Sequence, residues 1–139
     1  MKFEDYAIHD AIKKSLHNMG FVRPTDIQYK AIPSILKGED VLAVAQTGTG
    51  KTAAFAIPVV HLLQKQPKKR QAAGARCIAM VPTHELAIQI TEVFRQIAQY
   101  TQLETLGVFG GVDQAPQIAQ LSRGVDILIA TPGRLFDLK

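Results

Sequence analysis

The chain has 139 residues, of which 47% are hydrophobic and 20% charged, a balance typical of one globular domain or a large piece of one. Its longest apolar runs, residues 53–60 and 125–130, are far shorter than the roughly 20 residues that a membrane helix requires, so we expect no membrane partner. The formal charge of +4 suits nucleic acid or a nucleotide but favours them only slightly, and the acidic start predicts a cytoplasmic location rather than export.

The first half of the chain is predicted to be two helices followed by a strand, a glycine loop and a third helix. Apolar residues recur at helical spacing between Ala7 and Met19, and Gly20 then supplies a stop. A second helix is expected over Thr25 to Leu36. Residues 40–45 form a short valine-rich run that leads through a glycine loop into a helical pattern over residues 51–64. This order predicts a strand that passes directly into a helix.

The second half alternates predicted strands and helices. Strands are expected at Cys77–Val81, Leu103–Phe109 and Val125–Ala130. Between them, one helix carries apolar residues spaced from Leu86 to Ile97, and another lies near Gln114–Leu121. Alternating elements of these lengths imply right-handed crossovers. The predicted class is therefore α/β, with a parallel sheet covered by helices on both faces.

A glycine-rich segment at the predicted strand-to-helix junction has the composition of a phosphate loop. It reads Ala45-Gln46-Thr47-Gly48-Thr49-Gly50-Lys51-Thr52. Gly48 and Gly50 allow the backbone amides to surround phosphate oxygens beside a helix N-terminus. Lys51 would contact the β- and γ-phosphates of ATP, and the Thr52 hydroxyl would ligate Mg²⁺. We therefore predict a nucleotide site in which Lys51 and Thr52 also serve catalysis.

One position departs from the general phosphate-loop pattern, because Ala45 stands where the first glycine is usual. The alternative interpretation is an ordinary glycine-rich turn. A turn does not require Lys-Thr after its last glycine at the start of a helix, so nucleotide binding is favoured. Alanine followed by Thr-Gly-Thr-Gly-Lys-Thr resembles the phosphate loop of DEAD-box RNA helicases.

A second segment resembles the adenine-recognition motif of that family. It covers residues 20–28, and Phe3 stands at the upstream distance where the family places an isolated aromatic residue. The resemblance implies that Gln28 hydrogen-bonds the adenine edge while Phe3 and Arg23 pack on its faces. Thr25 and Gln28 also have the spacing of a helix capping box, and both interpretations can hold together because an amide accepts through oxygen and donates through nitrogen.

Three further segments resemble those with which the family holds the backbone of single-stranded RNA. The implied RNA-binding residues are Pro82, Thr83, Gly110, Gly111, Thr131, Gly133 and Arg134. Backbone contacts of this kind carry no base sequence, so binding should be sequence-independent and salt-sensitive. By themselves, the paired glycines and the Thr-Pro-Gly-Arg segment would be a loop and a helix start. His84 replaces the family's usual arginine, which removes a permanent positive charge.

The resemblance covers essentially the whole chain and implies a RecA-like fold that is incomplete. Residues 1–139 would form the amino-terminal portion of the first ATP-binding domain, with the Asp-Glu-Ala-Asp (Walker B) segment and the second domain expected beyond Lys139. The chain alone is then expected to lack hydrolysis and to associate with another chain through exposed sheet edges. The implied parent is an ATP-dependent RNA helicase. The alternatives are a non-catalytic adenine-nucleotide switch module and a DNA-directed helicase.

Overall fold

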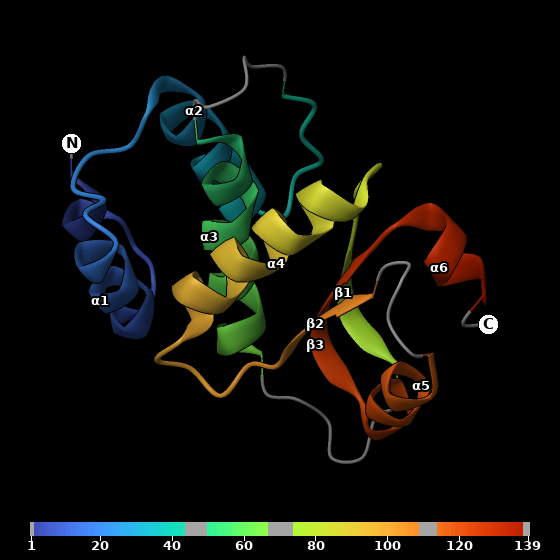
Figure 1. Cartoon of the computed structure of the whole chain (residues 1–139). Helices are drawn as coiled ribbons and strands as arrows, with labels where there is room; N and C mark the ends of the chain where they lie inside the picture. Colours follow the sequence, from blue (N-terminus) through green and yellow to red (C-terminus); the bar gives the residue numbers. More distant parts are fainter. Residues whose placement is uncertain (1, 44–49, 67–73, 109–113, 138–139) are drawn as a thin grey trace. The chain divides into compact units, whose positions relative to one another are not determined.

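The computed structural model describes residues 2–43, 50–66, 74–108 and 114–137 of the chain (Figure 1). The chain divides into two compact units. The first comprises Met1–Gln66 with Gln96–Gln102, and the second Pro67–Arg95 with Leu103–Lys139. Helix α4 (His84–Ala98) contributes residues to both units. None of the helices in these ranges combines the length and the apolar character needed to cross a bilayer.

The first unit is helical. Its elements are the 3₁₀ turn η1 (Phe3–Asp5), α1 (Asp10–Asn18), α2 (Asp26–Leu36), α3 (Lys51–Lys65) and the end of α4. Helices α2 and α3 pack against each other, and α1 also contacts α3. The largest fully buried side chains of these three helices are aliphatic: Ile12, Leu16, Ile32, Ile57 and Val60. Burial of these apolar side chains stabilises the unit.

The helix predicted to begin at Ala7 begins three residues later, at Asp10. The reason is local, because His9 has an extended backbone and its Nδ1 accepts a hydrogen bond from the Ala11 amide at 3.1 Å. A side-chain acceptor in this position caps a helix and thereby fixes its first residue. The second helix starts at Asp26, directly after its expected cap Thr25.

The prediction of a strand over residues 40–45 is wrong for the part that the structure describes. Residues 40–43 have no strand geometry, and Leu42 is 95% exposed. Residues 44 and 45 lie outside the described ranges. A strand exists only through hydrogen bonds to a neighbour, and no described strand pairs with this segment. Its valine-rich composition is therefore not sufficient to make it part of the sheet.

The second unit contains a three-stranded parallel sheet, which confirms the predicted α/β class. Its strands are β1 (Ala75–Met80), β2 (Thr105–Val108) and β3 (Val125–Ala130), in the order β1-β3-β2. Every residue of the central strand β3 is buried. Because successive side chains of a strand point to opposite faces, both faces of β3 are covered. Leu121 of α5 (Gln114–Arg123) packs against apolar residues of β2 and β3, and α6 (Pro132–Asp137) follows β3.

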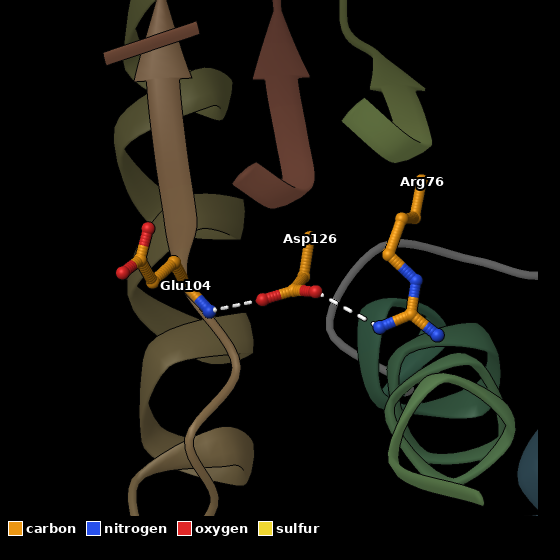
Figure 2. A network of polar contacts seen from close by, with 3 residues as sticks. All are labelled: Arg76, Glu104 and Asp126. Atoms are coloured by element: carbon orange, nitrogen blue, oxygen red, sulfur yellow. Dashed lines mark hydrogen bonds and ion pairs between the residues drawn. The ribbon is translucent and has the colours of Figure 1, made fainter. Parts of the chain in front are cut away.

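A polar network joins the amino-terminal ends of the three strands (Figure 2). Asp126, almost fully buried in β3, accepts a 2.9 Å hydrogen bond from Arg76 of β1. Its other carboxylate oxygen accepts a 2.8 Å hydrogen bond from the backbone amide of Glu104, just before β2. A buried carboxylate is tolerated only when such partners compensate for its desolvation. The network therefore fixes the register of the sheet at this end.

Candidate functional site

The end of the predicted phosphate loop lies at the start of α3. Gly50 has a left-handed backbone with φ of +79° and directly precedes Lys51, the first residue of the helix. Lys51 and Thr52 are both half-buried. The predicted contacts Ala45, Gln46, Thr47, Gly48 and Thr49 lie outside the described residues. In the described part, a glycine turn thus leads directly into Lys51 and Thr52 in the first turn of α3. Backbone amides and the helix dipole favour anions at this position.

Gln28 connects the start of α2 to this turn. Its side chain is 3% exposed, and its Nε2 donates a 3.2 Å hydrogen bond to the carbonyl oxygen of Gly50. Its Oε1 accepts a 2.9 Å hydrogen bond from the Thr25 amide. The left-handed backbone of residue 50 favours glycine, and a Cβ atom there would also force the Gln28 amide to move.

The capping interpretation of Gln28 is therefore confirmed, and the side chain has a further role that the sequence pattern did not reveal. Thr25 and Gln28 form the capping box of α2. The link to Gly50 joins residues 22 positions apart. The burial of Gln28 explains the link, because a buried amide needs partners for both its oxygen and its nitrogen, and the capping box supplies a partner only for the oxygen. One N–H of the Gln28 amide bonds Gly50, and the second is the group that an adenine edge could use.

The two residues predicted to pack on the faces of adenine differ in exposure. Arg23 is exposed, whereas Phe3 is 3% exposed and its ring packs at a tilt against Tyr6, with 5.7 Å between ring centroids. The amide of Phe3 donates a hydrogen bond to the carbonyl of Val22 at 3.0 Å, which places the two predicted residues in adjoining segments. In this conformation the Phe3 ring is covered, so stacking on a base would require it to move.

Two cavities adjoin predicted nucleotide residues in the first unit. One, of about 290 Å³, is lined by Lys51 together with apolar side chains of α2, α3 and residues 41–43. The other, of about 540 Å³, is lined by Phe3, Phe21 and residues of α1. Among the described residues, no group of three or more His, Cys, Asp or Glu side chains is arranged to hold a metal ion. The predicted magnesium ligand, Thr52, lies within the described residues.

The predicted RNA-binding residues that the structure describes gather at the carboxyl-terminal edge of the sheet. The Val81 amide donates to the carbonyl of Ala130 at 3.0 Å, and the Thr131 amide donates to the carbonyl of Val108 at 3.2 Å. The residues at which the chain leaves the three strands therefore lie side by side. Pro82 and Thr83 follow β1, and Thr131 follows β3. Gly110 and Gly111 lie outside the described residues.

Two helices begin at this edge. Thr83 is exposed, and its hydroxyl oxygen accepts a 3.2 Å hydrogen bond from the Leu86 amide in the first turn of α4. His84, the departure from the family pattern, is the exposed first residue of that helix. Gly133 is exposed and Arg134 half-buried in α6, which agrees with the predicted helix start. Backbone amides and an arginine at one sheet edge form an arrangement that suits phosphate groups.

Comparison with protein families gives a match over most of the chain. The family described as DEAD/DEAH box helicase matches residues 25–139. Among curated proteins, the "Probable ATP-dependent RNA helicase DDX27" of Mus musculus is 47% identical over 137 residues, which cover 99% of this chain and 18% of that protein. The "ATP-dependent RNA helicase DeaD" of Mycobacterium tuberculosis is 42% identical over 136 residues, covering 97% of this chain and 23% of the relative. The chain thus spans about a fifth of the length of these relatives.

Solved structures give the same result. A DEAD box protein from the hyperthermophile Methanococcus jannaschii matches with a TM-score of 0.87 and 38% identity, over 99% of this chain and 36% of that one. A hypothetical ATP-dependent RNA helicase from Sulfolobus tokodaii matches with a TM-score of 0.81 and 37% identity, over 94% of this chain and 36% of the other. The fold is therefore that of the RecA-like domain of these proteins.

Proposed function

This chain belongs to the DEAD/DEAH box helicase family, and we propose that it is the amino-terminal portion of the first ATP-binding domain of an ATP-dependent RNA helicase. The intact protein would hydrolyse ATP to unwind or remodel RNA duplexes. Membership of the family implies ATP binding. The single observation that carries the assignment of the nucleotide site is the hydrogen bond from Gln28 to Gly50, because it joins the adenine-recognition segment to the residue before Lys51.

The proposed nucleotide contacts follow from where these groups lie. Lys51 stands at the first position of α3, so its ammonium group could neutralise the β- and γ-phosphates while the helix N-terminus supplies amide donors. Gln28 would use its second N–H to recognise adenine, with Arg23 on one face of the base and Phe3 on the other after its ring becomes exposed. The remaining loop contacts are proposed to come from Ala45, Gln46, Thr47, Gly48, Thr49 and Gly50.

Magnesium is proposed as the metal of this site. Thr52 is half-buried in the first turn of α3, one residue beyond Lys51, and a hydroxyl oxygen is a ligand that Mg²⁺ accepts together with phosphate oxygens and water. When bound, the metal would neutralise charge on the phosphates. The contribution of this chain would be to position the phosphates beside Lys51 and Thr52.

The proposed RNA interface is the carboxyl-terminal edge of the parallel sheet. It would use amides and hydroxyls at the starts of α4 and α6 together with the Arg134 guanidinium, so it would read the sugar-phosphate backbone and no base sequence. The proposed residues are Pro82, Thr83, Gly110, Gly111, Thr131, Gly133 and Arg134. The intact protein would couple RNA to nucleotide by closing its two domains around both.

We propose that this chain associates with further polypeptide, because it has an exposed apolar surface. Strand β1 lies at one edge of the described sheet, and its Ile78 and Met80 are both more than half exposed. Edge strands with apolar side chains readily pair with another chain. We propose that this edge accepts further strands, from the same protein or from another. The cytoplasm remains the proposed compartment, and fractionation of cells that express the full-length protein tests it.

The experiment that tests the proposed function is ATP hydrolysis by the full-length protein with and without nucleic acid. Single-stranded RNA should stimulate hydrolysis, DNA of the same sequence should stimulate it less, and Lys51→Ala should abolish it. Hydrolysis that is absent under all conditions, with binding of ATP retained, would favour a nucleotide-switch module. Equal stimulation by DNA would favour a DNA-directed helicase.

A further inference from the structure

A pair of histidines joins the start of α1 to α3 within the first unit. The backbone amide of His9 donates a 3.0 Å hydrogen bond to Nδ1 of His61, which is half-buried on α3. The ring of His9 points back to its own helix, where Nδ1 accepts from the Ala11 amide at 3.1 Å. Both rings therefore act as acceptors through Nδ1. This requires that neither Nδ1 carries a proton.

Protonation of His61 would reverse the role of its Nδ1. A protonated imidazole donates through both nitrogens and accepts through neither. At His61, a proton on Nδ1 would face the amide hydrogen of His9, so the hydrogen bond between α1 and α3 would be replaced by repulsion. Loss of this bond would loosen the junction between α1 and α3.

The surroundings of His61 oppose its protonation. Burial lowers its pKa below the ordinary value of 6.5, and the positive charge of Lys65, one turn further along α3, and the neighbouring His9 lower it further. No carboxylate among the described residues contributes to this shift. The folded chain therefore binds the proton less readily than the unfolded chain does. The stability that the neutral ring contributes is present above pH 6.5 and is lost as the pH falls through that value toward the lowered pKa.

We propose that His9 and His61 form a proton-sensitive latch that holds the amino-terminal segment, residues 2–18, against α3. The latch is closed at neutral pH and opens in acid. The segment it holds includes η1, because Lys13 of α1 donates a 3.0 Å hydrogen bond to the carbonyl of Glu4. Apolar burial of Ile12 and Leu16 keeps α1 folded against the unit, so opening is local and starts at residue 9.

The latch has a consequence for the nucleotide, which rests on the proposed function. Residues 2–18 carry Phe3, and α3 begins with Lys51. If adenine is bound between the two, acidification will also weaken nucleotide binding. The latch itself does not depend on that outcome, because it can be observed without nucleotide.

Hydrogen exchange of the full-length protein without nucleotide tests the latch, with each rate divided by the intrinsic rate at the same pH. We expect protection of residues 9–16 to fall about three- to tenfold from pH 7.5 to pH 5.5, the effect of losing about one hydrogen bond, while α2 keeps its protection. His61→Gln retains an acceptor that does not titrate, so its protection should fall clearly less between the two pH values than that of the unsubstituted protein. His61→Lys places a permanent charge there and should show low protection at both pH values.

His17→Gln is the matched control, because His17 is an exposed histidine on the same helix. It should show the same fall in protection as the unsubstituted protein. The proposal is overturned if the unsubstituted protein keeps its protection at pH 5.5, or if His61→Gln loses protection to the same extent. Full protection in His61→Lys at pH 7.5 would also overturn it, as would a parallel loss throughout α2, which would indicate global unfolding.

Discussion

Nε2 of Gln28 lies 3.2 Å from the carbonyl oxygen of Gly50, so the first turn of α2 is bonded directly to the residue that precedes Lys51. The same Gln28 amide caps α2 through its oxygen. A change at either residue should therefore alter both the end of the proposed phosphate loop and the start of α2. This relationship joins two parts of the proposed nucleotide site, and each part can be tested by its own substitution.

Gly50→Ala should weaken adenine-nucleotide binding by at least about tenfold, equivalent to about 1.4 kcal/mol. A residue with a Cβ is strained by about 1–2 kcal/mol at a left-handed φ, and this Cβ would also displace the Gln28 amide. Gly38→Ala is the matched control, since Gly38 has a φ of +82° with open space around its Cβ position. Titration with labelled ADP should show a large loss for the first variant and little for the second. Equal losses would mean that backbone strain alone matters.

Asp126→Asn should lower the free energy of unfolding by about 1.5–3 kcal/mol, because it removes a charged hydrogen-bond partner of Arg76 inside the sheet. Asp26→Asn provides the contrast, because Asp26 pairs with Lys30 at the surface and both side chains are more than two-thirds exposed. Surface ion pairs contribute little. Denaturant unfolding followed by circular dichroism measures both, and an equally small effect at Asp126 would contradict its role in tying the strands together.

Arg134→Ala should weaken binding to single-stranded RNA by a similar factor for every sequence and should reduce the slope of log affinity against log salt by about 1. Arg123→Ala changes an exposed arginine just before β3, at the other end of the strands, and should leave the slope unchanged. Fluorescence anisotropy of the full-length protein at several salt concentrations gives these slopes. A slope that falls for both variants would indicate non-specific attraction.

His84→Arg should strengthen RNA binding, because it restores a permanent positive charge at the first position of α4. The slope of log affinity against log salt should steepen by about 1. His84→Gln, which keeps a polar side chain without charge, should bind no better than the unsubstituted protein. The same anisotropy titration at pH 8 compares the three proteins. Identical slopes for all three would place residue 84 away from the RNA backbone.

Features encoded by neighbouring residues could be predicted from the sequence. The capping box of α2 and the glycine turn into Lys51 each depend on a few consecutive residues, and strands β1 and β3 were recognisable as short apolar runs. Features that depend on distant partners could not. The ion pair of Asp126 joins residues 50 positions apart, and the bond from Gln28 to Gly50 spans 22. Only the folded chain brings such partners together.

The wrong strand at residues 40–43 and the misplaced start of α1 each have a physical cause. The apolar composition of residues 40–43 is that of a strand, but a strand is defined by a neighbour that local sequence does not specify. The start of α1 was predicted too early because His9 is a less common capping residue than Ser, Thr, Asp or Asn. Apolar periodicity therefore predicted the helix correctly but not its first residue.

The most direct test of the central claim is the affinity of the full-length protein for labelled ADP, compared among the unsubstituted protein, Lys51→Ala and Gln28→Ala. We predict that both substitutions weaken binding by at least about tenfold and that guanosine nucleotides do not compete, since Lys51 would contact phosphate and Gln28 would contact adenine. Loss of binding with Lys51→Ala alone would show that Gln28 only caps α2. Unchanged ADP binding by Lys51→Ala would contradict the proposed nucleotide site.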